Sequence, residues 1–473
     1  MLLHNAFGRK VPSTTNTTTT TKLASLQQLP WDHSHFLHRN THSPISYKPR
    51  SSLIARCALT KQGQRFLTSI ATVAAGDTSA TSRMISKFIA SSPKSVSLST
   101  LSHLLSPNTN YPHLSSLALP LYTRITESSW FSWNSKLVAD VVALLQKQGL
   151  LDEAESLTSG TVSRICLKER DLLSFYCNLI DSHTKHKSEL GFFKTWECLK
   201  KIISGSSSDY VKKRAYKSLV GGFCQMGLPH EAESVINEMR QQGIKPSVFE
   251  LRSIVEAYGV LGMFDEMLNG VVELESSGFL LDTVCSNMVL SSYGLHGKLS
   301  QMVLWMQKAK GLGTGFSIRT YNSVLNSCPT IVSMLQDFKS CPTSIEELID
   351  ILRGDEALLV QELIGSAVLA EIIEWNSLES KLDLHGMHLV AAYLIMLQWM
   401  EELLQRFTSG QYKIPAKFTV VCGLGKHSSL RDKPPLKSLV KELMLRTRSP
   451  LRIDRKNIGC FVAKGKAVKE WLC

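Results

Sequence analysis

Two side chains that could move protons lie two residues apart in the C-terminal part of the chain. Asp383 and His385 belong to the stretch KLDLHG, in which apolar and polar residues alternate as they do in a β-strand. Residues two apart on a strand project from the same face, so one could position a metal ion or water while the other transfers a proton. The same pair also occurs as a purely structural feature, because neighbouring groups can satisfy a buried histidine.

A glycine-rich, basic loop follows about forty residues later, in the stretch VCGLGKHS. Gly423 and Gly425 would let backbone N–H groups approach a phosphate. The side chains that could neutralise a nucleic-acid backbone there are Lys426, His427, Arg431 and Lys433, and Lys426 or His427 could stabilise developing charge. The loop is not a nucleotide-binding P-loop, because Val420 stands where that pattern needs glycine and His427 where it needs Ser or Thr.

Alternating strands and helices must hold these residues in place. After KLDLHG the sequence predicts an amphipathic helix at HLVAAYLIMLQWMEELLQRF, a strand at AKFTVVCG, a helix opened by proline at PPLKSLVKELML, and a hairpin around residues 454–457. These elements make a small α/β layer domain of roughly ninety residues over 381–473. The glycine-rich loop would then lie at the carboxyl edge of the sheet, where α/β folds bind ligands.

The middle of the chain repeats every 35 residues. The period appears in two glycine series, Gly227, Gly262 and Gly297, and Gly243, Gly278 and Gly313, and in the aromatic series Phe223, Tyr258 and Tyr293. Each period contains two amphipathic stretches separated by the first glycine, which predicts a helical hairpin. The clearest hairpins are 213–247, 248–282 and 283–317. Stacked hairpins form a solenoid with a concave surface, expected over 58–330, and residues 331–380 are predicted to be a helical linker.

Both regions resemble known families. A 35-residue helix-turn-helix period whose second helix ends EMRQQGIKP resembles the pentatricopeptide repeat family, best over 213–327. The order LDLHG, VCGLGKHS and NIGCFVAKGKAVKEWL resembles the small MutS-related (Smr) domain that is attached to some plant pentatricopeptide repeat proteins. The first resemblance implies that single-stranded RNA is read one base per repeat. The second implies nucleic-acid nicking or RNA endonuclease activity, as in some members, or binding alone, as in others.

The repeat resemblance also implies which side chains choose each base. They are the residue after the aromatic of the first helix and the last residue of the repeat: Lys217 with Ser247, Arg252 with Asp282, and Asn287 with Ser317. Asn322 opens a fourth repeat, whose pattern decays at CPTI. Asn287 with Ser317 looks like a standard combination that favours a pyrimidine, whereas Lys217 and Arg252 depart from the pattern and are candidates for phosphate contacts.

The Smr resemblance implies that Asp383 and His385 are the acid/base or metal-positioning pair. Gly423, Gly425 and Lys426 would form the phosphate cradle, and a divalent cation such as magnesium would be the cofactor if the domain cleaves RNA. One residue departs from the family, because Cys422 stands where threonine is usual. A thiol is a poor hydrogen-bonding group, so this change would weaken cleavage and leave backbone-mediated binding intact.

The first 57 residues have the composition of a targeting segment. They carry seven Lys and Arg against one acidic residue and include seven threonines between Thr14 and Thr21. Ser/Thr-rich, basic, acid-poor segments are typical of organelle transit peptides. Ile54 to Cys57 resembles the processing site of chloroplast precursors. We expect a disordered transit peptide over 1–57 and import into the chloroplast, with the mitochondrion as the alternative; a disordered cytosolic or nuclear tail is the other interpretation.

Charge and composition narrow the functions further. The net charge of +13 lies at the two ends, because 1–57 contributes +6 and 381–473 contributes +10, which leaves −3 for 58–380. The repeats therefore supply no general attraction for RNA. No run approaches the roughly 18 apolar residues of a membrane-spanning helix. The eleven cysteines include no CxxC pair, which favours free thiols in a reducing compartment over zinc sites.

These observations predict an organellar RNA-binding protein that processes or stabilises a transcript, with single-stranded RNA and other organellar RNA-processing proteins as partners. The α/β domain would act either as an endonuclease or as a non-catalytic binder that protects RNA. A scaffold that binds protein through both regions is the alternative from another class.

Overall fold

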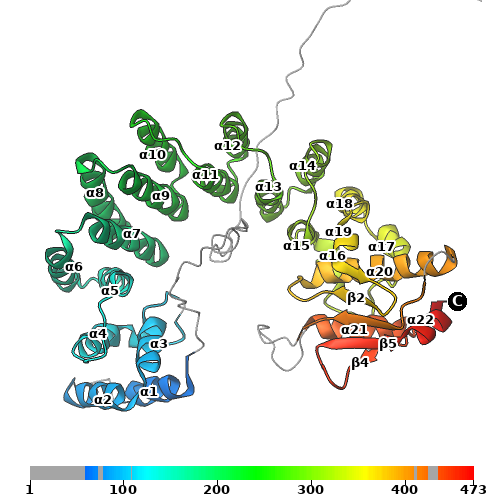
Figure 1. Ribbon diagram of the computed structural model, residues 1–473, viewed down its shortest axis with the longest axis horizontal. Coiled ribbons are helices and arrows are strands. Elements are labelled where there is room, and N and C mark those ends of the chain that lie inside the picture. The colour runs from blue at the N-terminus through cyan, green and yellow to red at the C-terminus, as the bar shows by residue number, and fades with distance from the viewer. Residues whose placement is uncertain (1–58, 73–77, 108, 410–412, 424–434, 473) are drawn as a thin grey trace, which may run out of the picture.

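The protein forms an arch of helices that ends in a small α/β unit (Figure 1). The computed structural model describes residues 59–72, 78–107, 109–409, 413–423 and 435–472. The predicted transit peptide over 1–57 lies outside these ranges. No helix within them has both the length and the apolar composition needed to cross a membrane.

The solenoid begins with a compact group of helices and continues as stacked hairpins. The first group contains α1 (Lys61–Ala71), α2 (Thr78–Ser91), α3 (Lys94–Leu104), a 3₁₀ turn (Pro112–Leu117) and α4 (Ala118–Thr126). The hairpins are α5 (Ser135–Lys147) with α6 (Leu151–Ile165), α7 (Glu169–His186) with α8 (Glu189–Gly205), α9 (Asp209–Met226) with α10 (Pro229–Gln241), α11 (Val248–Leu261) with α12 (Phe264–Ser276), and α13 (Thr283–Leu295) with α14 (Leu299–Gly311). The first helix of each hairpin lies on the inside of the arch and the second on the outside.

The periodic glycines are left-handed residues that end the helices. Gly227 and Gly262 cap α9 and α11 with φ of 80° and 74°, and the glycines that follow the second helices of the three repeats also have positive φ. Glycine adopts this conformation without the steric cost that a Cβ atom imposes. Lys187, with φ of 54°, holds the corresponding position after α7. The glycine series is therefore interrupted there, although the α7–α8 hairpin is present, and it resumes at Gly149 after α5, with φ of 78°.

Residues 331–380, predicted as a helical linker, are largely helical and pack against the neighbouring elements. This segment follows α15 (Ile318–Leu325) and contains α16 (Pro329–Met334), α17 (Ile345–Ile351), α18 (Gly354–Ile364), α19 (Val368–Ile372) and a short strand. Helix α18 lies beside α14, where Lys310 and Glu362 form an ion pair at 3.0 Å. Leu359, Val360 and Leu363 of α18 are fully buried. The apolar faces of these short helices thus complete the solenoid instead of spanning a gap.

The described residues of the α/β unit form a five-stranded mixed sheet. Its elements are β1 (Ile373–Trp375), β2 (Glu379–Asp383), α20 (Leu389–Ser409), β3 (Lys417–Val421), α21 (Pro435–Arg446), β4 (Arg452–Ile453), β5 (Cys460–Lys464) and α22 (Gly465–Leu472). The strand order is β1-β2-β3-β5-β4. Strands β2 and β3 are parallel and joined through α20, and all other pairs are antiparallel. Strand β1 falls within the predicted linker, so the sheet begins before residue 381.

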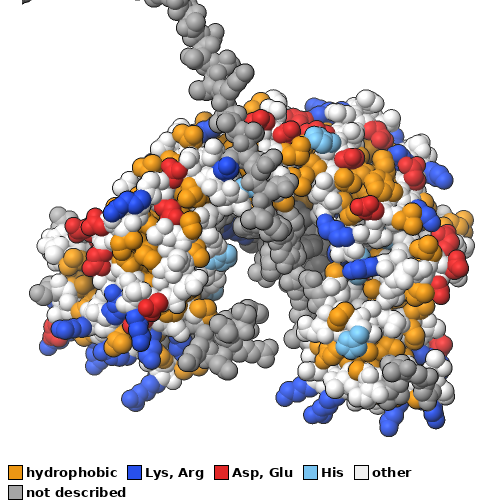
Figure 2. All heavy atoms as spheres, turned by 180° about the vertical axis from the view of Figure 1, so that it is seen from behind, with side chains coloured by type: hydrophobic (Ala, Val, Ile, Leu, Met, Phe, Trp, Pro, Cys, Tyr) orange, Lys and Arg blue, Asp and Glu red, His pale blue; other side chains and the backbone are white. Residues whose placement is uncertain are grey.

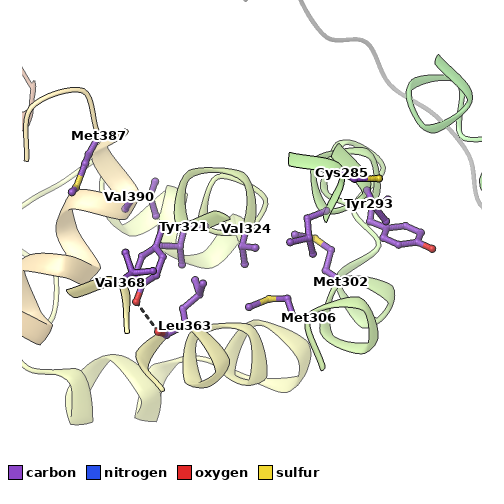
Figure 3. Close-up of a cluster of buried hydrophobic side chains, with 14 of the residues drawn as sticks. Cys285, Tyr293, Met302, Met306, Tyr321, Val324, Leu363, Val368, Met387 and Val390 are labelled. Carbon is purple, nitrogen blue, oxygen red and sulfur yellow. Dashed lines mark hydrogen bonds between the residues drawn. The ribbon is translucent and has the colours of Figure 1, made fainter. Parts of the chain in front are cut away.

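Within the described ranges, two hydrophobic cores support the arch. One extends from Leu67 to Leu179 through the first helices. The other runs without a break from Leu173 in α7 to Val468 in α22, so the last hairpins and the α/β unit share it. Figure 3 shows its junction, where side chains of α15, α18 and α20 meet. The predicted fold class, a helical-hairpin solenoid followed by a small α/β region, is confirmed.

Candidate nucleic-acid interface

Four predicted base-reading residues recur at one position of successive inner helices. Lys217, Arg252, Asn287 and Asn322 are spaced by 35 residues and belong to α9, α11, α13 and α15. Because these helices form the inner row of the arch, the four residues follow one another along the same row (Figure 1). Their local partners differ, and those partners decide what each can offer to a ligand.

Lys217 contacts an aromatic ring and not its predicted partner. Its Nζ lies 4.1 Å from the centre of the Phe249 ring, within the range of a cation–π interaction. Ser247 instead caps α11, because its Oγ accepts from the backbone N–H of Phe249 and its own N–H donates to Glu250 at 2.8 Å. The structure therefore adds Phe249, which the sequence analysis missed although it lies two residues after Ser247.

The second predicted pair is joined directly. Arg252 Nη2 and Asp282 Oδ2 form an ion pair at 2.6 Å, with 22% and 46% of the side chains exposed. The other oxygen of Asp282 accepts from the backbone N–H of Cys285 at 3.0 Å and thereby caps α13. The carboxylate is thus fixed by the helix end, and it holds the guanidinium on the inner surface.

The third pair is also in contact. Asn287 Nδ2 donates to Ser317 Oγ at 3.4 Å, and Asn287 Oδ1 accepts from Thr320 Oγ1 at 2.7 Å. Asn287 is only 5% exposed, and both ends of its amide have partners within the protein. Thr320 is the third component of this position, and the sequence pattern gave no sign of it.

Asn322 points toward the α/β unit. Its Oδ1 accepts a hydrogen bond from the backbone N–H of His388 at 3.0 Å, just before α20 begins. The decay of the repeat pattern after Asn322 therefore coincides with a change of partner, from a fourth repeat to the α/β unit.

The Asp383–His385 pair lies at one edge of the sheet, in a geometry that differs from the prediction. Asp383 is the last residue of β2, and His385 lies in the turn beyond it, so the two do not share a face of one strand. They are joined instead by a hydrogen bond of 2.6 Å between His385 Nδ1 and Asp383 Oδ1, and the same oxygen accepts from the backbone N–H of His385 at 3.0 Å. An aspartate on Nδ1 favours the tautomer that leaves Nε2 as the acceptor. The histidine side chain is 70% exposed, so it is open to a substrate.

Three strand ends bring Gly423, the first glycine of the predicted phosphate loop, beside this pair. Val421 at the end of β3 is in register with Asp383 on one side and Cys460 on the other. Gly423 follows with φ of 77°, and a Cβ atom on it would lie 3.6 Å from His385 Cβ. The remaining predicted phosphate-binding residues lie outside the described ranges: Gly425, Lys426, His427, Arg431 and Lys433.

Cys422 is held in the sheet as a neutral thiol. Its backbone N–H donates to the Gly459 carbonyl at 2.8 Å, and the residue is 8% exposed. Burial raises the pKa of Cys422 to about 12, so the thiolate form needed of a nucleophile is scarce at neutral pH. The residue that stands in place of the usual threonine thus contributes packing and a backbone contact.

The predicted hairpin around residues 454–457 has a basic tip that lies next to Gly423 and was not among the predicted site residues. The turn between β4 and β5 is fixed by hydrogen bonds from Lys456 N to Asp454 Oδ1 and from Gly459 N to Asn457 Oδ1. A Cβ atom on Gly459 would lie only 3.0 Å from the Gly423 carbonyl carbon. Arg455 and Lys456 are exposed at the tip. Figure 2 shows Lys and Arg side chains gathered over this end of the molecule. The adjacent cations in the predicted hairpin were the available signal.

A metal ion at this edge of the sheet would need ligands in addition to the side chains that the structure describes. Among the described residues, no group of three or more His, Cys, Asp or Glu side chains is arranged to hold a metal ion. Asp383 could supply one carboxylate ligand, whereas the imidazole of His385 is not a ligand that magnesium prefers. Magnesium commonly keeps several waters and uses substrate phosphates, so one carboxylate fits a substrate-assisted site.

The family model and the similar proteins that we found all carry pentatricopeptide repeats in their descriptions. The PPR repeat model matches residues 214–244. A pentatricopeptide repeat-containing protein of Arabidopsis thaliana is 58% identical over 435 residues, which cover 91% of this chain and 86% of that protein. A further Arabidopsis thaliana pentatricopeptide repeat-containing protein, named chloroplastic, is 22% identical over 41% of this chain and 37% of that protein.

Solved structures show a weaker likeness. The crystal structure of the maize pentatricopeptide repeat protein PPR10 is 14% identical, with a TM-score of 0.39, and the match covers 81% of this chain and half of that one. At this score the likeness adds nothing to the fold described above.

Proposed function

The chain belongs to the pentatricopeptide repeat proteins, and from that premise we propose that it binds single-stranded RNA along the inner helices of its arch. The observation that carries this proposal is the row formed by Lys217, Arg252 and Asn287, one residue per hairpin at equal spacing. A series of this kind suits a polymer that presents one unpaired base per repeat. Ser247, Asp282 and Ser317 are proposed as the second member of each position.

The three positions would contribute differently to binding. Lys217 and Arg252 carry positive charge, so they favour the phosphate backbone and make binding salt-dependent. Lys217 on Phe249 also presents a cation and a ring at one place, which suits a stacked base. Asn287 with Ser317 is polar and uncharged, so it is the position proposed to discriminate between bases. Its amide would have to exchange a contact with Ser317 or Thr320 for one with the base.

We propose that the α/β unit is an Smr domain and that its Asp383–His385 edge cleaves RNA. His385 Nε2 would accept the proton of the attacking hydroxyl or water as its oxygen bonds to phosphorus, while Asp383 holds the ring through Nδ1. The P–O bond to the leaving oxygen would break, and that oxygen would take a proton from water. Gly423, with Gly425, Lys426, His427, Arg431 and Lys433, would contact the phosphate. Magnesium, when bound, would supply additional positive charge at the phosphate.

A non-catalytic binder that protects RNA is the second candidate. It is favoured by Cys422, a buried thiol where the family usually has threonine. In that case the α/β unit would hold the RNA backbone and block exonucleases. A protein-binding scaffold is the third candidate, since helical-hairpin solenoids also bind proteins.

The proposed compartment is the chloroplast, with the mitochondrion as the alternative. The basic, Ser/Thr-rich composition of residues 1–57 supports import, and several relatives of low identity are named chloroplastic. Fusion of residues 1–70 to a fluorescent reporter tests the proposal, and a diffuse cytosolic signal would contradict it.

The RNA proposal is tested by sequencing the RNA that co-purifies with the full chain from the organelle. We expect one or a few transcripts to be enriched, and absence of any enrichment would exclude both RNA functions. The enriched RNA is then incubated with the protein, with and without magnesium. Cleavage that Asp383→Ala and His385→Ala both reduce by about 10²-fold or more would identify the endonuclease. Binding without cleavage would identify the protecting function.

A further inference from the structure

The last inner helix of the solenoid is bonded to the α/β unit. Asn322 Oδ1 accepts from the backbone N–H of His388, and Asn326, one helical turn later in the chain, donates from Nδ2 to His388 Nδ1. Because an amide Nδ2 can only donate, Nδ1 of His388 must be the unprotonated acceptor. Burial lowers the pKa of His388, which favours the same neutral form. Asn322 of α15 and Asn326, the C-cap of that helix, therefore hold the residue just before α20.

The buried side chain of Tyr321 makes further contacts at the same junction. Tyr321, fully buried, donates from its hydroxyl to the Leu363 carbonyl at 2.6 Å, and Gln398 Oε1 of α20 lies 3.2 Å from the same hydroxyl. Figure 3 shows Tyr321 directed toward Leu363 and Val368, with Met387 and Val390 of the α/β unit on its far side. The packing brings the two parts together, and the directional bonds of Asn322 and Asn326 can set their relative angle.

The bonded residue is close to the proposed reaction centre. His388 follows His385 by three residues, and only Gly386 and Met387 separate them. Met387 is 8% exposed and belongs to the shared core. The turn that carries His385 is therefore anchored at one end by β2 and at the other by the contacts of α15.

The same asparagine occupies the repeat position of the base-reading residues. Asn322 follows Lys217, Arg252 and Asn287 at the 35-residue spacing, but its acceptor is taken by the α/β unit. The row of proposed base-reading side chains thus ends at Asn287, and beyond Asn322 the chain continues into the unit that carries Asp383 and His385. A strand bound along the inner row would meet the Asp383–His385 edge at a distance fixed by the junction.

We propose that Asn322 and Asn326 are positioning residues that hold the Asp383–His385 edge in a fixed register with the inner row. The α/β unit then contacts RNA at a constant number of nucleotides from the segment that the solenoid binds. This inference rests on the proposed RNA binding and holds for either activity of the α/β unit, because a protecting domain also defines a boundary.

The test compares the wild-type chain with Asn322→Ala/Asn326→Ala on the co-purified transcript. Nucleotide-resolution footprinting should give one sharp boundary for the wild type. The double variant should bind RNA with an affinity within about twofold of the wild type. Its boundary should nevertheless spread over several nucleotides, because the two hydrogen bonds that orient the α/β unit are lost while the buried packing remains. Asn322→Asp keeps the acceptor and should keep the sharp boundary. Asn237→Ala, on the outer helix α10, is the matched control.

Hydrogen exchange of the free protein provides a measurement that does not need RNA. Amides at the start of α20 should exchange about tenfold faster in the double variant, and those of α11 should not change. If the double variant does not fold, Asn326→Ala alone, at an exposed residue, takes its place. Unchanged exchange at α20, or a sharp boundary in a variant with faster exchange, would overturn the proposal. A wild-type chain that binds no RNA would reject the proposed function itself, whatever the exchange result.

Discussion

Arg252 and Asp282 neutralise each other on the surface proposed to face RNA. Their ion pair of 2.6 Å joins the first helix of one repeat to the residue that caps the first helix of the next. An incoming phosphate must compete with Asp282 for the guanidinium. The acidic partner therefore sets how much of the positive charge of Arg252 is available to a polyanion.

Asp282→Asn should strengthen RNA binding. Asparagine is as good a helix N-cap as aspartate, so α13 should keep its end while the charge is removed. Affinity is expected to rise about three- to tenfold at low salt, and the slope of log K against log salt should steepen by about 0.7. Arg252→Ala should lower the affinity. Fluorescence anisotropy with the co-purified RNA over a salt series measures both effects.

A charge control accompanies that comparison. Asp265→Asn removes one acidic residue from α12 on the outer row, away from the proposed RNA path. If it raises affinity as much as Asp282→Asn does, the effect is one of net charge, and the proposed role of the Arg252–Asp282 pair fails.

The helical repeats could be predicted because their ends leave a chemical signature. The left-handed C-cap favours glycine strongly, so Gly227 and Gly262 show the period without any knowledge of packing. Lys187 fills the same role before α8 and is invisible to that pattern, and the α7–α8 hairpin is also longer, with helices of 18 and 17 residues. A helix end is thus recognisable in the sequence where glycine recurs at the left-handed position. It is not recognisable where another residue, such as Lys187, adopts that conformation.

The sequence predicts the individual residues of the candidate site but not the hydrogen bonds between them. Asp383, His385 and Gly423 were found from motifs, but the hydrogen bond between the first two depends on the turn after β2. Asn322 bonds to the backbone N–H of His388, which is 66 residues later in the chain, so this contact cannot be inferred from a local pattern. Strand β1 has only three residues, too few for a periodic signal, and it lies in a stretch that the sequence predicts to be helical.

Removal of the hairpin-tip charges should weaken RNA binding through the backbone. Arg455→Ala/Lys456→Ala is expected to reduce the salt slope by up to about 1.4, because each cation can neutralise one phosphate. The fold should be unaffected, since the turn is held by Asp454, Asn457 and Gly459. Lys194→Ala/Lys201→Ala on α8 of the outer row removes the same charge elsewhere. Equal loss of slope in both double variants would show that the hairpin has no special contact.

Two adjacent glycines of α9 should respond in opposite directions to alanine. A Cβ atom on Gly222 would lie 2.6 Å from Ile180 Cγ2 and 2.7 Å from Phe192 Cε2, whereas the nearest atom to one on Gly221 would be Phe249 Cε1 at 3.9 Å. Gly222→Ala should therefore destabilise the solenoid by about 1–3 kcal/mol through overpacking. Gly221→Ala should be neutral or stabilising by up to about 1 kcal/mol, because alanine favours the helix. Urea unfolding compares the two variants, and equal stability would contradict the packing at Gly222.

His183 should make the stability of the solenoid fall in mild acid. It is 1% exposed, its Nδ1 has no hydrogen-bond partner within the described structure, and burial lowers its pKa to about 4 from 6.5. The fold therefore favours the neutral ring, so its stabilising contribution is complete above pH 6.5 and is lost as the pH falls toward 4. The loss amounts to about 2–3 kcal/mol over that range. His183→Leu should flatten the fall in melting temperature between pH 7.5 and pH 5, whatever its effect at pH 7.5. His113→Leu, at an exposed position before α4, should leave the profile unchanged, and an equally steep profile in His183→Leu would show that another group controls the acid response.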